Sequence, residues 1–118
     1  MIDSITEYAR LANITLADRV RKNNMLVELN AATGIASEAG EINEITKKRY
    51  FHDHPNTPET ELHMKKELGD LVWYWALMCY AYGFEPAEVL QVNIDKLKAR
   101  YPDGFSPERS INRAAGDI

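Results

Sequence analysis

The sequence predicts an all-α domain, and three observations support this fold class. No stretch alternates apolar and polar residues with the enrichment in β-branched side chains that is typical of strands. Residues 25–50 form a long segment without proline, which favours one continuous helix. A second long segment starts with helix-initiating residues at Thr57 and stops at Gly83, a residue type that often ends helices.

The first helix is expected to start near Asp3 or Ser4 and to continue as far as Leu11 or Leu16. Glu7 lies three residues after Ser4, which is a weak form of the capping box. The N-terminal helix is therefore short, and the polar segment 17–24 that follows it is ambiguous.

The second predicted helix covers residues 25–50. Gly34 and Gly40 lower its intrinsic helix propensity by ~1 kcal/mol each. Residues 51–56 contain two histidines and a proline and predict a connecting loop.

The third helix begins after Thr57, which supplies a capping hydroxyl, and Pro58 suits the first helical position. Acidic residues in the first turn face the positive end of the helix dipole. This helix is expected to reach Tyr82.

A fourth helix opens at Pro86 and ends near Arg100, because Pro102 and a turn-prone Asp-Gly pair follow. Residues 105–118 form a polar tail that we expect either to be mobile or to fold over another part of the molecule. The chain is interpreted as one domain covering residues 1–118.

The composition excludes several classes of protein. The 118 residues include 18 acidic and 14 basic side chains, and the net charge of -4 disfavours a nucleic-acid polymer as partner. One cysteine excludes an internal disulfide framework and a thiolate zinc site. The longest apolar run, residues 71–82, is too short to span a membrane, and the N-terminus does not resemble a signal peptide. We expect a cytoplasmic protein without a membrane partner.

An acidic pair, Glu38 and Glu41, lies in the second helix with spacing that places both carboxylates on one face, together with Glu44 and Lys48. The opposite face is apolar and contains Leu29, Ala32, Ile35, Ala36, Ala39, Ile42 and Tyr50. Taken alone, such an acidic face is usually solvated.

A second acidic pair, Glu67 and Asp70, lies at the start of an apolar stripe of the third helix. Residues 71–82 are apolar all round, which predicts burial on every side. The two carboxylates are therefore expected to be at least half buried, and a buried carboxylate needs a cation. The cation is either a Lys or Arg of a neighbouring helix or a bound divalent metal.

Together the two pairs supply four carboxylates, which suit Mg²⁺ or Mn²⁺ rather than zinc or a redox metal. The chain has no Glu-x-x-His pair of the kind found in di-iron bundles. For His52, His54 and His63 we expect surface or capping roles.

Basic side chains could bind phosphate. Asn93, Lys96 and Arg100 run along one flank of the fourth helix, and Lys47 and Lys48 follow the first acidic pair. A solvated flank is the equally simple interpretation. No glycine-rich phosphate loop is present, and one aromatic residue of the third helix could stack on a base.

Three segments resemble the MazG-like branch of the all-α nucleoside triphosphate pyrophosphohydrolases: GIASEAGEINEITKK, KKELGDLVWYWALM and NIDKLKARYPDGFSPERS. The resemblance covers residues 30–113. It implies a four-helix bundle that assembles as a dimer or tetramer. It also implies Mg²⁺-dependent hydrolysis of a (deoxy)nucleoside triphosphate to the monophosphate and pyrophosphate.

The resemblance makes Glu38, Glu41, Glu67 and Asp70 the metal ligands and catalytic residues. It implies phosphate and sugar contacts from a further set, namely Lys47, Lys48, Asn93, Lys96, Arg100 and Tyr101. We add Tyr74 as the stacking residue, and Asn30 as a contact to base or sugar because it shares the acidic face.

Many relatives carry a glutamate where this chain has Ser37, so the general base is either Glu44 or a water, or the metals alone activate the attacking water. Among substrates we favour a purine such as dGTP, with Mn²⁺ as a substitute for Mg²⁺. If a phage encodes the protein, it acts in the host cytoplasm. The alternatives are a non-enzymatic helical interaction module and a phosphohydrolase acting on a different nucleotide phosphoanhydride.

Overall fold

Six α-helices and no strand make up the fold, which confirms the all-α class. The computed structural model describes residues 1–118. In chain order the helices are α1 (Ile5–Asn13), α2 (Asp18–Arg21), α3 (Asn24–Phe51), α4 (Pro58–Tyr82), α5 (Pro86–Arg100) and α6 (Pro107–Ile111). No helix combines the length and the apolar character that a membrane-spanning segment needs.

The boundaries of the four main helices lie close to those that the sequence predicts, because the capping residues act as expected. The hydroxyl of Thr57 accepts a hydrogen bond from a backbone N–H in the first turn of α4, at 3.2 Å. Gly83 ends α4 with a left-handed φ of 69°, a conformation that costs glycine little. Ser4 accepts from the N–H of Glu7 at 3.1 Å, and α1 ends at Asn13.

The two short helices, α2 and α6, are not predicted from the sequence. For α6 a signal was present, because Ser106-Pro107-Glu108 repeats the pattern that starts α4, and Ser106 caps the helix in the same way. A helix of five residues shows no apolar periodicity, so this signal is easily overlooked. Ala17, which precedes α2, makes no side-chain capping bond and gives no such signal.

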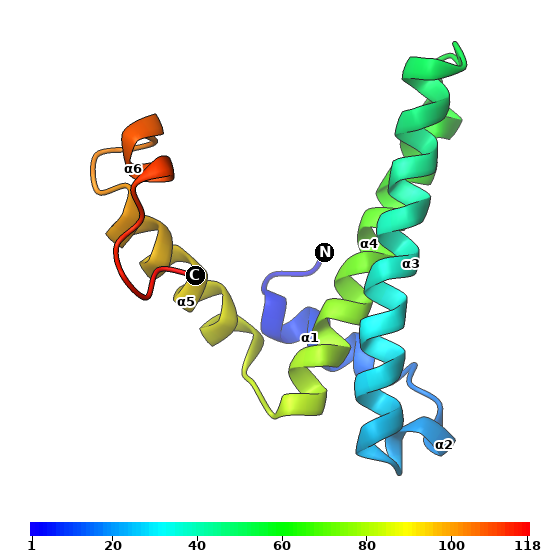
Figure 1. Cartoon of the computed structure of the whole chain (residues 1–118). Helices are drawn as coiled ribbons and strands as arrows, with labels where there is room; N and C mark the ends of the chain where they lie inside the picture. Colours follow the sequence, from blue (N-terminus) through cyan, green and yellow to red (C-terminus); the bar gives the residue numbers. More distant parts are fainter.

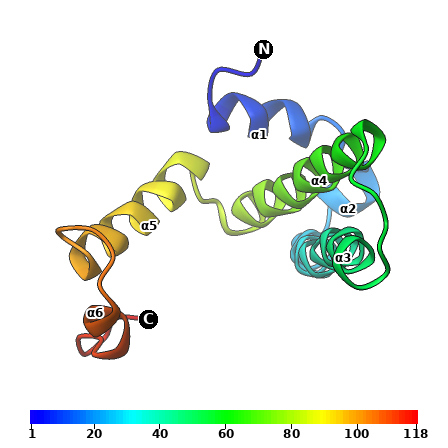
Figure 2. The same cartoon turned by 90° about the horizontal axis from the view of Figure 1, so that it is seen from above.

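Helix α4 is the central element of the arrangement. Helix α3 packs antiparallel along one side of it, and α1 crosses its opposite side (Figures 1 and 2). Helix α2 lies beside the start of α3, whereas α5 leaves the end of α4 and points away from the α3–α4 pair (Figure 1). One chain therefore does not close the four-helix bundle, which stays a prediction.

The core is small, since only eight of the 118 residues are buried. Its centre consists of Leu16, Val27, Ala31 and Leu77. Gly34 continues the buried stripe of α3, and the ring of Tyr74 lies directly against its backbone. Because Gly34 has no Cβ, α3 and α4 approach closely next to the two acidic pairs.

The prediction that residues 71–82 are buried on every side is wrong for the single chain. Only Ala76, Leu77 and Cys79 of this segment are buried, and Tyr80 and Tyr82 are exposed. Helices α3 and α1 cover two sides of α4, but α5 does not cover the remainder.

The two faces of α3 are also oriented differently from the simplest interpretation of the sequence. The face with Glu38 and Glu41 continues the buried stripe of Val27, Ala31 and Gly34, so it faces α4 and is not merely solvated. The opposite, apolar face is the outer one: Leu29, Ala32, Ala36, Ala39 and Tyr50 are exposed. In one chain this apolar face has no partner.

The C-terminal tail folds back onto the end of α5. The guanidinium of Arg100 donates two hydrogen bonds to the carboxylate of Asp117, one of them from Nε at 2.7 Å. This contact places Asp117, near the end of the chain, against α5.

Candidate metal centre

Three of the four predicted ligands meet between α3 and α4. Glu38 of α3 and Glu67 and Asp70 of α4 each offer a carboxylate oxygen, and these oxygens lie within 4.8 Å of one another. Glu38 and Glu67 are half-buried, whereas Asp70 is exposed. The expected half burial thus holds for Glu67 but not for Asp70, because Asp70 lies on the open edge of α4.

Glu41 does not belong to this cluster of oxygens, although it lies near it. It is exposed, and its negative charge is felt by Glu38, one helical turn earlier. The sequence spacing places Glu38 and Glu41 on one face, but only Glu38 brings its oxygens to those of Glu67 and Asp70. Glu41 therefore adjoins the centre, and its role as a ligand stays a prediction.

The charge of the cluster is not balanced by the protein. Burial raises the pKa of Glu38 above its ordinary value, and a hydrogen bond with Glu67 and the charges of the neighbouring carboxylates raise it further. No lysine or arginine forms an ion pair with the three clustered carboxylates. The first of the two predicted cations, a lysine or arginine of a neighbouring helix, is therefore absent. The second, a divalent metal ion, fits the all-oxygen donor set.

Two residues next to the cluster were not assigned from the sequence. Nε2 of His63 lies 2.9 Å from Oε1 of Glu67, although His63 is on the surface as expected. The hydroxyl of Tyr8 in α1 donates to the carbonyl oxygen of Gly69 at 3.3 Å. Burial raises the pKa of Tyr8, and the charge of Asp70 adds to this effect. The i, i+4 spacing of His63 and Glu67 could have revealed the first contact, but the Tyr8 contact depends on how α1 crosses α4.

Glu44, one candidate for the general base, is held by two lysines. Its carboxylate lies 2.6 Å from Nζ of Lys47 and 3.5 Å from Nζ of Lys48. The hydrogen bond from Lys47 is the main reason why the pKa of Glu44 lies below its ordinary value. A carboxylate with a lowered pKa is a weaker base, which favours water activation without a protein base. His52 ends α3, in the capping role expected of it.

The predicted phosphate contacts fall into two separate groups. Lys47 and Lys48 follow the acidic face of α3, about two and a half to three turns after Glu38 of the cluster. Asn93, Lys96, Arg100 and Tyr101 lie on or just after α5, which points away from α3 (Figure 1). Arg100 is paired with Asp117 and also lies over the ring of Tyr101. One chain therefore does not bring the second group to the carboxylates.

The predicted base contacts lie nearer to the centre. Tyr74 follows Asp70 by one turn, packs on Gly34 and meets Trp73 edge to face, at 4.9 Å between ring centroids. Asn30 is half-buried one turn before Gly34. Both residues lie beside the contact between α3 and α4, and their roles stay predictions.

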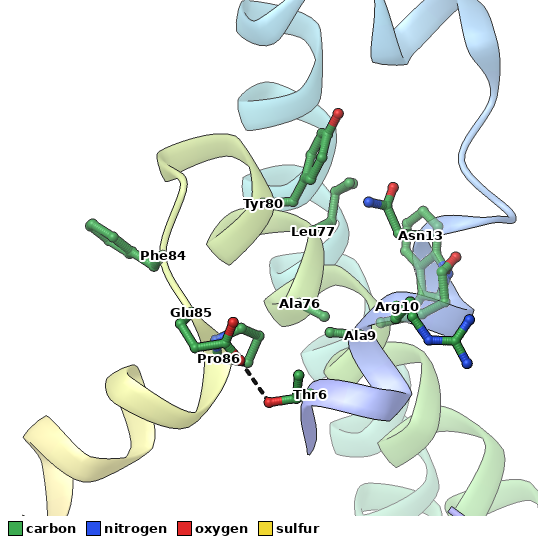
Figure 3. Close-up of a pocket in the computed structure, with 12 residues that line it drawn as sticks. Thr6, Ala9, Arg10, Asn13, Ala76, Leu77, Tyr80, Phe84, Glu85 and Pro86 are labelled. Atoms are coloured by element: carbon green, nitrogen blue, oxygen red, sulfur yellow. Dashed lines mark hydrogen bonds between the residues drawn. The ribbon is translucent and has the colours of Figure 1, made fainter. Parts of the chain in front are cut away.

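A separate apolar groove of about 330 Å³ lies between α1, the end of α4 and the start of α5 (Figure 3). Ala76, Leu77 and Tyr80 line it on the α4 side. At one end Oγ1 of Thr6 donates to Oε1 of Glu85 at 2.6 Å, which ties α1 to the residue preceding α5 (Figure 3). None of the clustered carboxylates lines this groove.

The fold and the cluster define an all-α protein with a cluster of carboxylates between two antiparallel helices. The chain belongs to the MazG nucleotide pyrophosphohydrolase family, because residues 28–105 match the model of the MazG nucleotide pyrophosphohydrolase domain. This confirms the resemblance noted in the sequence. The chain is also 32% identical over 85 residues to the Gene 37 protein of Mycobacterium phage L5, covering 71% of this chain and 69% of that protein. A comparison with solved structures found no match.

Proposed function

We propose that this protein hydrolyses a (deoxy)nucleoside triphosphate to the nucleoside monophosphate and pyrophosphate, with Mg²⁺ as cofactor and Mn²⁺ as a substitute. The observation that carries the proposal is the cluster of Glu38, Glu67 and Asp70, whose oxygens lie within 4.8 Å of one another without a lysine or arginine partner. Membership of a nucleotide pyrophosphohydrolase family gives this cluster its substrate class.

In this proposal Glu38, Glu67 and Asp70 hold the metal, and Glu41 completes the ligand set. When bound, Mg²⁺ polarises the phosphate oxygens and neutralises the charge that develops during hydrolysis. Glu67 is only 13% exposed, so its carboxylate is held firmly between the helices. Lys47 and Lys48 lie on the same side of α3 as the acidic residues and can bind a phosphate group there. To do so, they would have to release their contacts with Glu44.

We further propose that the active form is a homo-oligomer, a dimer or a tetramer. The exposed apolar face of α3 needs a cover, and a second copy of the chain offers an identical helix face. A partner copy would also complete the four-helix bundle. In addition, it could bring the α5 residues Asn93, Lys96 and Arg100, together with Tyr101, to the carboxylates.

The test is a nucleotide panel with the purified full chain and Mg²⁺. The eight common ribo- and deoxyribonucleoside triphosphates, together with dUTP and dITP, are assayed for both pyrophosphate and orthophosphate. We expect pyrophosphate and the monophosphate as products, with preference for a purine such as dGTP. Stepwise release of orthophosphate would instead support a phosphohydrolase acting on another phosphoanhydride.

A non-enzymatic interaction module is the second alternative, and it makes a different prediction. An enzyme that binds Mg²⁺ or Mn²⁺ in the folded state gains stability from the ion, so its melting temperature rises with ion concentration. A module with solvated carboxylates shows no such rise and no turnover. The similarity to a phage protein supports the host cytoplasm as the place of action.

A further inference from the structure

A polar groove of about 430 Å³ lies between the end of α3 and the beginning of α4, next to the metal centre. Only one of the ten residues that line it is hydrophobic. Its polar and charged lining residues are Glu41, Glu44, Lys48, Arg49, His54, Thr57, Thr60 and His63. We call this feature the loop-end groove.

The loop-end groove is continuous with the metal centre. Glu41, at one end, is the fourth predicted ligand, and His63 contacts Glu67 at 2.9 Å. Lys48 and Arg49 lie about two helical turns further along α3, or about 11 Å by helix rise. Long side chains on a helix lean toward its N-terminus, so both cationic groups extend back toward Glu41.

Two cationic side chains, Lys48 and Arg49, line the groove together with the acidic Glu41 and Glu44, and His54 and His63 add imidazole nitrogens. Lys48 already contacts Glu44, with 3.5 Å between Nζ and Oε1. Arg49 makes no ion pair with any carboxylate; its guanidinium lies 5.3 Å from the centre of the Tyr50 ring. An unpaired guanidinium is well suited to binding two phosphate oxygens at once.

The first turn of α4 adds donors on the other side. Thr57 and Thr60 line the groove, and their hydroxyl oxygens lie 3.2 Å apart. The positive end of the α4 dipole faces the same side. By contrast, Arg100 is paired with Asp117, and its helix α5 points away from α3 (Figure 1). Within one chain, Arg49 is therefore the unpaired arginine of a groove that adjoins the carboxylates.

We propose that the loop-end groove binds the β- and γ-phosphates of the substrate, and therefore the pyrophosphate product, through Arg49, Lys48 and His54. The proposal rests on the proposed function and adds the direction in which the triphosphate lies. The α-phosphate is at the carboxylate cluster, the terminal phosphates point toward the α3–α4 loop, and the nucleoside lies on the other side of the cluster, toward Tyr74 and Asn30.

The test compares a double variant, Arg49→Gln with His54→Gln, with the matched control Lys66→Gln. Lys66 is exposed on α4 beside Glu67 and does not line the groove. Inorganic pyrophosphate and a nucleoside monophosphate are used as competitive inhibitors of triphosphate hydrolysis by the full chain with Mg²⁺. Circular dichroism and melting curves confirm that each variant is folded.

We expect the double variant to raise the inhibition constant of pyrophosphate, and KM for the triphosphate, by about tenfold or more, because charge-assisted hydrogen bonds to phosphate are lost. Inhibition by the monophosphate should not change, and Lys66→Gln should behave as the unmodified protein. Unchanged inhibition by pyrophosphate in the double variant overturns the proposal, and so does selective weakening of the monophosphate.

The two levels of the proposal fail separately. If the unmodified chain hydrolyses no nucleoside triphosphate, the proposed function is wrong. If it hydrolyses one but the double variant binds pyrophosphate as tightly as the unmodified chain, only the assignment of the groove is wrong. Isothermal titration of the unmodified chain with pyrophosphate and Mg²⁺ gives a reading that does not depend on turnover.

Discussion

Glu67 is the residue on which most interactions of the metal centre converge. Its carboxylate lies within 4.8 Å of that of Glu38 across the helix interface and contacts His63 on its own helix. Its position between a carboxylate and an imidazole orients its oxygens before any ion binds. Such partners are known to tune metal ligands, and changing them typically costs about 10–100-fold in metal affinity or activity.

We expect Glu67→Gln to reduce turnover by about 100-fold or more, because the neutral amide replaces a ligand oxygen and its charge. The helical circular dichroism should remain, and the rise in melting temperature with Mg²⁺ should disappear. Glu88→Gln on α5 is the control, since Glu88 is exposed and distant from the cluster. Wild-type activity in Glu67→Gln would show that the metal assignment is wrong.

At the scale of the elements, the close approach of α3 and α4 depends on one position. A Cβ built on Gly34 overlaps the ring of Tyr74, whereas a Cβ on Gly40 in the same helix meets nothing within 4 Å. The two glycines look alike in the sequence, where both lower helix propensity. Only Gly34 is required by the packing that brings the acidic pairs together.

We therefore expect Gly34→Ala to destabilise the protein by about 1–3 kcal/mol through overpacking. Gly40→Ala, the matched control, should be neutral or stabilising by up to about 1 kcal/mol, because alanine favours helix. Chemical denaturation measures both values. In the double variant with Tyr74→Ala, the cost of Gly34→Ala should shrink, and a fully additive cost would contradict this account of the contact.

An ion pair between Arg100 of α5 and Asp117 connects the C-terminal tail to this helix. The hydrogen bond from Arg100 is the main reason why the pKa of Asp117 lies below its ordinary value. A lowered carboxyl pKa means that the pair adds stability at pH values above the unfolded pKa, and that this stability is lost as the pH falls through the folded pKa.

Asp117→Asn should accordingly release the tail at neutral pH, and trypsin should cleave after Arg109 and Arg113 severalfold faster than in the unmodified chain. A ¹³C NMR titration of the Asp117 carboxyl carbon should give a midpoint below that of an ordinary aspartate. Asp103→Asn serves as the control, because Asp103 is exposed and makes no side-chain contact with a basic residue. Equal cleavage rates in Asp117→Asn and the unmodified chain would show that the pair does not hold the tail.

The whole molecule is more extended than a compact domain of its length. Its radius of gyration is 17.5 Å, against about 13.5 Å expected for 118 compactly folded residues. The packing also indicates that the single chain is not compact. Its core is small, one side of α4 is uncovered, and the apolar outer face of α3 has no partner. A chain with this shape is suited to assembly with further copies.

Light scattering after size exclusion should therefore give two or four times the chain mass. Ala39→Arg places a charge in the middle of the apolar face of α3 and should shift the protein toward the monomer. Ala17→Arg makes the same change at an exposed position before α2 and should leave the mass unchanged. A monomeric unmodified chain would contradict the proposed assembly.

Much of the fold follows from local chemistry and could be predicted. Caps at Ser4 and Thr57 and the glycine at position 83 set helix ends through contacts within a few residues. The spacing of the acidic pairs likewise placed each pair on one helix face. Such features depend only on residues that are close along the chain, and these can be identified from the sequence.

The site could be predicted only in part, because its geometry depends on which helix faces meet. That Glu38 joins Glu67 and Asp70 while Glu41 stays apart depends on the rotation of α3 against α4. The contact of Tyr8 with Gly69 depends on the crossing of α1. The pairing of Arg100 with Asp117 depends on a fold-back over 17 residues.

The helical class, the helix ends and the residue types that suit a divalent metal and a phosphate chain follow from the sequence alone. Only the packing of the helices shows that the acidic face of α3 points toward α4, that its apolar face points outward, and that Arg49 and His54 line a polar groove beside the acids. The physical reason is that helix propensity and capping act over single turns. Which helix face is buried depends on the interactions of all packed side chains together. In this protein the close contact of Tyr74 with Gly34 is one of the interactions that select the buried face of α3.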